Sequence, residues 1–245
     1  TILVKSNFSS KNKHLATITD IRNNSNGKVI SNVNNIDELN DGDIVTIDDQ
    51  GIINVVHEIQ SKHNALFITG KCNSNCVMCP QPPVIEEPDR HNLNLKQISL
   101  LPKNTKTIGI TGGEPTLIGN RLFEIIEAIK KRLPNVYINL LSNGIKFEKI
   151  KYAKEFANII DDKTVVDIPL YSDIDEIHNQ IVGSKTFYRT IEGIYNLAKF
   201  NVKIGIRVVI HKMNYDRLPK LAEYLFFNFP FVYQVAFMQM EPVGN

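Results

Sequence analysis

Three cysteines share one short segment of this 245-residue chain. Cys72, Cys76 and Cys79 lie within the sequence ITGKCNSNCVMCPQPP, and the chain has no other cysteine. An odd, local set of thiols cannot close the long loops of a disulfide framework. Clustered thiolates in a reducing compartment favour zinc or an iron–sulfur cluster. The spacing therefore predicts a metal centre in a cytosolic protein.

Two kinds of metal centre suit such a loop. A structural zinc site takes four closed ligands, so a histidine would have to complete the set. His57, His63 and His91 are near in sequence, but none has zinc-finger spacing. A cubane 4Fe–4S cluster held by three cysteines keeps one iron open for a substrate, whereas the usual ferredoxin run supplies every ligand from cysteine. The residues favour iron–sulfur over zinc, and three unrelated cysteines remain the third alternative.

The composition narrows the class of protein. Hydrophobic residues make up 42% of the chain and the formal net charge is +2. Such a chain can build one sizeable core, or one main domain with a small appendage. No basic stripe suggests nucleic acid, no apolar run approaches a membrane span, and no signal peptide precedes the first strand-like segment. We expect a cytoplasmic protein with neither a membrane nor a nucleic acid as partner.

The first sixty or so residues have the pattern of short β-strands. Segments rich in Ile, Val and Thr are separated by turn clusters of Asn, Gly and Asp such as NDGD. These segments occupy residues 1–5, 15–21, 28–33, 43–48 and 51–59. We predict a small β-rich N-terminal domain over residues 1–62, which is expected to pack on the main domain.

From residue 63 onward strand and helix patterns alternate. Leu122, Ile125, Ile126, Ile129 and Leu133, for example, follow helical spacing. Helices are expected near residues 94–101 and over 120–133, 147–160, 186–200 and 215–227. Strands are expected at 65–69, 105–116, 135–144, 164–172, 202–210 and 231–244.

Six buried, β-branched strands with intervening helices predict an α/β fold with a parallel sheet, either open or closed as a barrel. Both arrangements place ligands at the carboxyl ends of the strands. The cysteine loop lies just past one strand end, and TGGEP, LLSNG, PLYSD and MEPVG lie past others. These segments are therefore expected to converge on one rim.

Two of these segments together resemble a known family. Cys-x-x-x-Cys-x-x-Cys after the first strand of the array, with Gly112-Gly113-Glu114-Pro115 after the second, is similar to the radical S-adenosylmethionine (SAM) superfamily. The resemblance covers roughly residues 64–245 and implies a partial (β/α)6 barrel over residues 63–245. It implies a 4Fe–4S cluster and SAM as cofactors. It also implies an enzyme that reductively cleaves SAM to a 5′-deoxyadenosyl radical, which abstracts hydrogen from a substrate.

The resemblance assigns ligands to the cluster and to SAM. The three cysteines would ligate three irons, and the amino and carboxylate groups of SAM would chelate the fourth. Gly112 and Gly113 would offer backbone carbonyls to the amino group, because glycine has no Cβ to keep the ligand away. Glu114 could add a side-chain contact.

The resemblance also implies contacts along the rest of the rim. Ser142 and Asn143 match a polar position at the third strand, near the ribose or the carboxylate. Arg207, on the fifth strand, has the guanidinium fork that suits the SAM carboxylate. Met78 stands where the family commonly has an aromatic residue near adenine. Met240, which begins MEPVG, would lie along the adenine.

Several of these residues also have ordinary structural explanations. The glycines of GGEP could simply form a tight strand-to-helix turn. Asn143-Gly144 is a common turn dipeptide, and Arg207 could form a surface ion pair.

Other side chains of the later strands carry weaker predictions. His178 stands where many relatives have a histidine after the fourth strand, but a lone histidine is expected to pack or cap. Asp167 and Tyr171 are predicted to face the substrate. Met238 and Met240 are expected in the core.

A narrower resemblance concerns the substrate. CNSNCVMCPQPP, with a β-rich head carrying LNDGDIVTID, resembles the HxsC-type maturases of the His-Xaa-Ser system, and YSDIDEIHNQIVGSKTFYRTIEGIYNL is similar to peptide-modifying members. This implies a peptide or protein substrate, a partner maturase, and an electron donor such as flavodoxin or ferredoxin. The alternatives are an activating enzyme that installs a glycyl radical, or a small-molecule enzyme of the deazaguanine type. The alternative of another class is a non-catalytic, zinc-stabilised binding domain.

Overall fold

The computed structural model describes residues 3–5, 16–18, 29–30, 36–48 and 50–240. The chain folds into two compact units, one of residues 1–64 with 100–102 and one of residues 65–99 with 103–245. The predicted division into domains 1–62 and 63–245 stays a proposal.

The first unit contains two small sheets. β1 (Leu3–Lys5), β2 (Ala16–Ile18) and β3 (Val29–Ile30) form a parallel sheet. After a 3-10 turn at Ile36–Glu38, β4 (Ile44–Ile47) and β5 (Ile53–His57) pair antiparallel. These strands fall within the predicted segments, parts of which lie outside the described residues.

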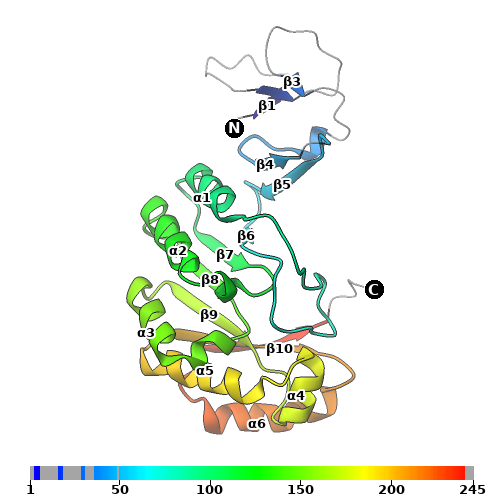
Figure 1. Cartoon of the computed structure of the whole chain (residues 1–245), viewed down its shortest axis with the longest axis vertical. Coiled ribbons are helices and arrows are strands. Elements are labelled where there is room, and N and C mark those ends of the chain that lie inside the picture. The colour runs from blue at the N-terminus through cyan, green and yellow to red at the C-terminus, as the bar shows by residue number, and fades with distance from the viewer. Residues whose placement is uncertain (1–2, 6–15, 19–28, 31–35, 49, 241–245) are drawn as a thin grey trace. The chain divides into compact units, whose positions relative to one another are not determined.

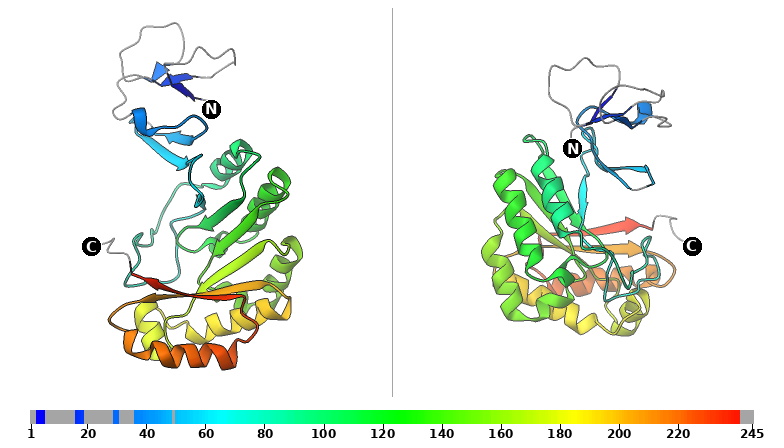
Figure 2. Two further views of the ribbon diagram at one scale, coloured as in Figure 1. Left: turned by 180° about the vertical axis from the view of Figure 1, so that it is seen from behind. Right: turned by 45° about the horizontal axis from the view of Figure 1, so that its top comes forward.

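The second unit is built on a six-stranded parallel sheet in the order β11-β10-β9-β8-β7-β6. Each strand pairs with its neighbours in the sequence, and the helices lie on the outer face of the curved sheet (Figures 1 and 2). A doubly wound sheet would reverse its strand order and carry helices on both faces, so this is a barrel-type arrangement. β6 and β11 are not paired with each other in the described residues. The predicted partial (β/α)6 barrel is confirmed. Its strands are β6 (Ala65–Phe67), β7 (Thr107–Thr111), β8 (Tyr137–Leu141), β9 (Thr164–Pro169), β10 (Lys203–Ile210) and β11 (Gln234–Gln239).

The helices of this unit include one that the sequence did not predict. The five predicted helices are present as α1 (His91–Leu100), α2 (Arg121–Arg132), α3 (Ile150–Ile159), α5 (Phe187–Lys199) and α6 (Leu218–Asn228). The additional helix is α4 (Asp175–Val182). Two signals mark it: acidic residues in its first turn, and Gly183 after its end with a φ of 63°. None of the described helices has both the length and the apolar character that a membrane span requires.

The core lies between the sheet and the helices. Leu66, Ile110, Leu140, Val166 and Ile204 are register partners across five neighbouring strands, and each is at most 1% exposed. The alternate residues point to the other face, where β7 and β8 carry exposed or half-buried side chains. The expectation of fully buried strands is therefore wrong for β7 and β8, and also for β11, in which no residue is buried. The inner face of β7 and β8 is available to line a site.

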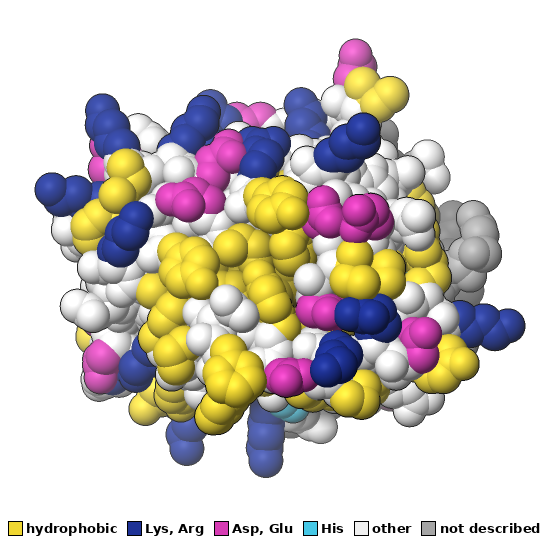
Figure 3. Space-filling model, turned by 90° about the horizontal axis from the view of Figure 1, so that it is seen from below, with side chains coloured by type: hydrophobic (Ala, Val, Ile, Leu, Met, Phe, Trp, Pro, Cys, Tyr) yellow, Lys and Arg dark blue, Asp and Glu magenta, His cyan; other side chains and the backbone are white. Residues whose placement is uncertain are grey.

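Apolar side chains remain exposed at the far edge of the sheet. Phe226 and Phe227 on α6 are 74% and 71% exposed, and Figure 3 shows hydrophobic side chains gathered on the face seen from below. A groove of about 510 Å³ lies here, lined by residues of α6 and β11 and of the segment between them. The described residues leave this surface uncovered.

Candidate cofactor site

The cysteine loop is bonded to the end of β7. Gly113 N donates to Thr69 O at 2.7 Å, and Glu114 N donates to Lys71 O at 2.8 Å. A Cβ on Gly112 or Gly113 would lie less than 3.0 Å from the carbonyl oxygens of Thr69 or Lys71, closer than real Cβ atoms come. The glycines are therefore required by the approach of the cysteine loop itself. This is a second reason for them beside the predicted approach of a ligand.

The other side of the cysteine loop rests on α4. Asn75 N donates to Val182 O and Val77 N donates to Ile181 O, both at 2.9 Å. A Cβ on Gly183 would lie less than 3.0 Å from Asn75 O. Sequence reasoning missed this contact, although the glycine that ends α4 is one of its visible signs.

The three thiols lie close enough to affect one another. All three cysteines are free and half-buried. Burial raises the pKa of Cys76 to about 12, and the neighbouring Cys72 and Cys79 thiolates add to the rise. Cys79 Sγ donates to Gln81 O at 2.9 Å.

The donor set fits a cluster with three protein ligands. As the side chains of the described residues stand, no group of three or more His, Cys, Asp or Glu is arranged to hold a metal ion. The thiols must therefore turn and lose their protons on binding, as metal ligation requires. The loop supplies three soft sulfur donors, the ligand type that iron–sulfur clusters select.

Glu114 joins the ends of β7 and β8. Its side chain is 1% exposed, and its carboxylate accepts bonds from Thr116 N (3.0 Å), Thr116 Oγ1 (2.6 Å), Ser142 Oγ (2.8 Å) and Asn143 N (2.6 Å). Burial raises the pKa of Glu114, and these four donors oppose the rise. All four bonds are internal to the protein, so this carboxylate positions Ser142 and Asn143.

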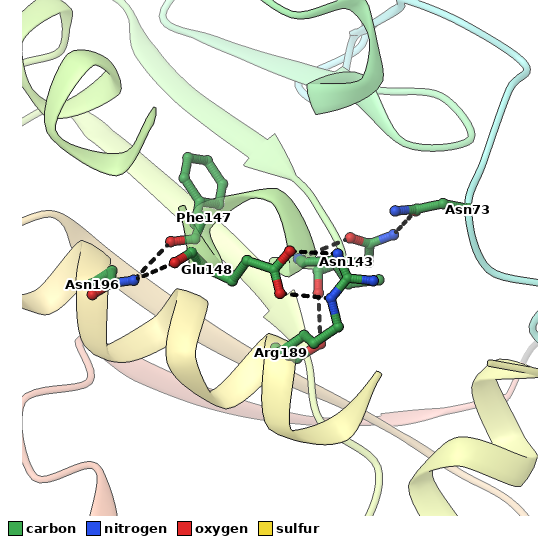
Figure 4. Close-up of polar contacts among 8 residues, drawn as sticks. Asn73, Asn143, Phe147, Glu148, Arg189 and Asn196 are labelled. Carbon is green, nitrogen blue, oxygen red and sulfur yellow. Dashed lines mark hydrogen bonds and ion pairs between the residues drawn. The ribbon is translucent and has the colours of Figure 1, made fainter. Parts of the chain in front are cut away.

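Asn143 connects three parts of the rim. Its Nδ2 donates to Asn73 Oδ1 of the cysteine loop at 2.6 Å (Figure 4). Its carbonyl accepts from Thr190 Oγ1 of α5 at 3.1 Å, and its Oδ1 accepts from Ile145 N at 3.1 Å. Gly144 follows with a φ of 78°, as a turn requires. Asn143 is thus both a turn residue and a link to the cysteine loop.

The turn after β8 is itself bonded to α5. Asn196 Nδ2 donates to the carbonyls of Phe147 (3.1 Å) and Glu148 (3.0 Å), and the Arg189 guanidinium forms an ion pair with the Glu148 carboxylate (Figure 4). These contacts hold the segment that carries Asn143.

Arg207 lies on the inner face of the sheet without an acidic partner. Its Nε and Nη2 each lie 3.3 Å from the sulfur of Met238, and among the described residues no carboxylate pairs with it. The alternative that Arg207 forms a surface ion pair is therefore not found among the described residues. Met238 is half-buried, whereas Met240 is 42% exposed, so the expected core position is wrong for Met240. The rest of MEPVG lies outside the described residues.

Asp167 is part of a polar row across the inner face. Its carboxylate accepts from Asn139 Nδ2 at 3.0 Å and from Gln234 Nε2 at 3.4 Å, and its side chain is 5% exposed. Gly205, its partner on β10, leaves room for it, because a Cβ there would overlap Asp167 Oδ1.

His178 is packed rather than exposed. Its side chain is 1% exposed, and Nδ1 accepts from Tyr171 N at 3.3 Å. Its ring stacks on Tyr171 at 5.8 Å and meets Phe187 edge-on at 5.5 Å, measured between ring centroids. Burial lowers the pKa of His178 to about 4. These contacts agree with the packing role expected of a lone histidine.

Tyr171 backs the cysteine loop. It forms an apolar cluster with Ile181 and Val182, against which Cys76 and Met78 pack. Its side chain is 7% exposed, and the predicted substrate-facing position of Tyr171 stays a prediction. Met78 has an apolar neighbourhood, as a residue beside adenine would need.

Known proteins share both the sequence pattern and the fold. Residues 66–225, more than half of the chain, match the family model of the Radical SAM superfamily. Streptococcus suis SuiB bound to S-adenosylmethionine has a TM-score of 0.63 and 14% identity, over 75% of this chain and 41% of that one. The structure of anSMEcpe with AdoMet and the Kp18Cys peptide has a TM-score of 0.59 and 22% identity. The match covers 73% of this chain and 52% of that chain.

A curated relative adds a different activity class. A candidate glycyl-radical enzyme activating enzyme of Methanocaldococcus jannaschii is 32% identical over 100 residues, which are 37% of this chain and 27% of that protein. The chain thus spans well under two thirds of the length of this relative.

The preference for iron–sulfur over zinc is confirmed, because members of the matched family use a 4Fe–4S cluster and SAM. The chain belongs to the radical SAM superfamily.

Proposed function

We propose that this chain is a radical SAM enzyme that reductively cleaves SAM to a 5′-deoxyadenosyl radical, which abstracts hydrogen from a peptide or protein. The observation that carries this proposal is the bonding of one cysteine-rich loop to the ends of β7 and β8. Gly113 and Glu114 bind it through the backbone, and Asn143 binds it through Asn73. The predicted ligands of the cluster and of SAM therefore belong to one connected rim.

Cys72, Cys76 and Cys79 would hold the cluster, which when bound supplies the electron for cleavage. Gly112 and Gly113 would present backbone carbonyls to the SAM amino group. Pro115, buried at the first position of the 3-10 turn Pro115–Ile118, fixes the direction of the chain after Glu114.

The remaining contacts follow the strand ends. Ser142 and Asn143 would bind the ribose or the carboxylate, held in place by the buried Glu114. Arg207 would bind the carboxylate, since it has no acidic partner among the described residues. Met78 and Met240 would lie beside the adenine, where polarizable thioethers pack well.

Two findings support a peptide substrate. SuiB has also been solved bound to its precursor peptide SuiA, with a TM-score of 0.56 to this chain and 14% identity, and anSMEcpe with the Kp18Cys peptide. The sequence resemblance alone favours a maturase of the His-Xaa-Ser type, working with a partner maturase and with flavodoxin or ferredoxin as electron donor. Three free thiols suit the reducing cytoplasm.

The second candidate is an activating enzyme that installs a glycyl radical. The 32% identity to the M. jannaschii protein over 100 residues favours it. In that case the substrate is a folded protein whose backbone glycine loses hydrogen.

The test is anaerobic reconstitution followed by reaction with SAM and dithionite. We expect about four irons per chain with matching sulfide, and 5′-deoxyadenosine as product. Cys76→Ala should abolish this cleavage, while Val77→Ala, in the same loop and with a 62% exposed side chain, should retain it. Stoichiometric zinc without sulfide, or cleavage by Cys76→Ala, would overturn the assignment.

A second measurement separates the two substrates. The reduced enzyme is incubated with SAM and with peptides encoded near its gene, and the peptides are examined by mass spectrometry. A mass loss or cross-link on a peptide supports the maturase. A glycyl-radical signal in the electron paramagnetic resonance spectrum of a protein partner supports the activating enzyme.

A further inference from the structure

A cavity of about 380 Å³ lies in the second unit, beside the base of the cysteine loop. It is bounded by the end of β6, the segment before α1, the first turn of α1, and the start of α2. Its polar lining consists of Thr69, Lys71, Glu87, Asp89, Arg90, His91, Asn94 and Arg121. None of the residues proposed to contact SAM or the cluster lines it.

Two donors at this cavity lack acceptors. Asn94 is 2% exposed, and its Nδ2 has no hydrogen-bond partner in the part of the chain that the structure describes. The buried Nε of Arg90 also has none there, since the Glu87 carboxylate oxygen lies 3.7 Å away, beyond hydrogen-bond length. An unsatisfied buried donor destabilises the folded chain. A ligand that brings acceptor oxygens would remove this destabilisation.

The two carboxylates that line the cavity are already occupied. Glu87 accepts from Gly70 N at 2.7 Å and from the Thr69 hydroxyl. Asp89 accepts from His91 N at 3.0 Å and from Arg121 Nη1 at 2.8 Å. Neither carboxylate accepts a hydrogen bond from Asn94 Nδ2 or Arg90 Nε, and Glu87 is only an ion-pair neighbour of Arg90 at 3.7 Å.

The charge of the lining is positive. The lining has three basic side chains (Lys71, Arg90 and Arg121) and two acidic ones (Glu87 and Asp89), which leaves one positive charge in excess. No ion pair of the Lys71 side chain is found among the described residues.

His91 contributes a further polar atom to the wall. Its Nε2 lies 2.9 Å from the Glu124 carboxylate, and its buried Nδ1 has no partner in the described residues. Because Nε2 donates to Glu124, Nδ1 is an acceptor, so the groups that the cavity offers an anion are the surplus cation and the two free donors.

We propose that this cavity binds a compact oxyanion, a carboxylate or phosphate group, whose oxygens accept from Asn94 Nδ2, Arg90 Nε and the Lys71 ammonium. Charged acceptors form the stronger hydrogen bonds with such donors. Lys71 immediately precedes Cys72. The bound anion would therefore connect the base of the cysteine loop to α1.

The test is isothermal titration of the full reconstituted chain with inorganic phosphate and, separately, with acetate, at constant ionic strength set with chloride. We expect saturable binding of at least one anion. The anion that binds more tightly identifies the group. Phosphate or acetate at ten times its dissociation constant should also lower the unfolding equilibrium constant about 11-fold.

Variants locate the binding. Asn94→Leu, which removes the free donor at similar volume, should weaken binding at least about tenfold, as the loss of one charge-assisted bond predicts. Arg90→Gln tests the same site should Asn94→Leu fail to fold. Lys96→Met, on an exposed position of α1 outside the cavity, is the control. No saturable binding of either anion, or equal weakening in Lys96→Met, would overturn the site and leave the proposed SAM chemistry unaffected.

Discussion

The two sides of the cysteine loop are held by different physical means. On the β7 side, Gly113 lies against the Lys71 carbonyl, and on the α4 side Gly183 lies against the Asn75 carbonyl. Both approaches require a residue without Cβ. The surroundings differ, because the first side is a polar network around a carboxylate and the second is an apolar cluster around an imidazole.

Each side has a buried titratable group near its centre, Glu114 or His178, and the environments of these two groups are opposite. Glu114 accepts four hydrogen bonds, whereas His178 accepts one and is otherwise surrounded by rings. Hydrogen bonds are directional, so the network around Glu114 sets the orientation of the strand ends. Apolar packing is not directional, so the cluster beside His178 sets the position of Cys76. Both sides also hold the loop by backbone hydrogen bonds, so the oriented side and the packed side differ in their side-chain surroundings.

Removing the centre of the polar side should have the largest effect. Glu114→Ala leaves the donors of Ser142, Asn143 and Thr116 buried without an acceptor. We expect a loss of about 3 to 5 kcal/mol in the free energy of unfolding, measured by denaturant titration of the cluster-free chain. Glu127→Ala, an exposed position on α2, is the control and should change little. A loss below about 1 kcal/mol would mean that the polar side does not depend on its carboxylate.

Acidification should act on the two sides with opposite sign. The pKa of His178 is about 4 in the folded chain against 6.5 for a free histidine. The unfolded chain therefore takes up the proton first, and stability falls as the pH drops from 6.5 to 4, by at most about 3 kcal/mol. The raised pKa of Glu114 has the reverse effect, because its folded form gains stability as the pH falls.

Comparing wild type with His178→Gln isolates the imidazole. Glutamine keeps an acceptor for Tyr171 N but does not titrate. The unfolding free energy of the His178→Gln protein should therefore fall less between pH 7 and pH 4 than that of the wild type. Parallel curves for the two proteins would show that His178 is not protonated on unfolding in this range.

The packed side can also be tested by adding a methyl group. Gly183→Ala places a Cβ against Asn75 O, and Gly51→Ala adds one at a φ of +85° where no other atom lies within 4 Å. Both variants carry the strain of positive φ, so their difference reports the clash. We expect Gly183→Ala to lose about 1 to 3 kcal/mol more, and to bind less iron on reconstitution. Equal losses in the two variants would argue that α4 does not restrain the loop.

The sequence predicted the oriented side far better than the packed one. Cys72, Gly112 and Gly113 belong to local motifs, and the strands follow from runs of apolar residues. α4 has only eight residues, too few for a clear helical period. The Gly183–Asn75 contact joins distant parts of the chain and has no local signal, and the Asn73–Asn143 bond likewise spans 70 residues. Sequence reasoning named Glu114 as a possible ligand contact and missed its internal bonds, because two of its donors, on Ser142 and Asn143, come from a different strand end.

The smallest effect is expected for the ion pair between Arg189 of α5 and Glu148 of the turn after β8. Comparing this pair with a buried contact of the same helix separates surface bonds from buried ones. The Arg189–Glu148 ion pair joins side chains that are 48% and 25% exposed, and such pairs contribute about 0 to 1 kcal/mol. Arg189→Met should therefore change the unfolding free energy by less than about 1 kcal/mol, and the change should vanish at high salt.

Asn196→Leu provides the matched comparison on the same helix. The Asn196 side chain is 1% exposed, and its Nδ2 donates to two carbonyls of the turn. Leucine would leave both carbonyls short of a partner, so we expect a salt-independent loss of about 1 to 3 kcal/mol. If Arg189→Met proved the more costly, the turn that carries Asn143 would be held from the surface. The oriented side of the cysteine loop would then weaken with ionic strength, which a network of buried bonds should not do.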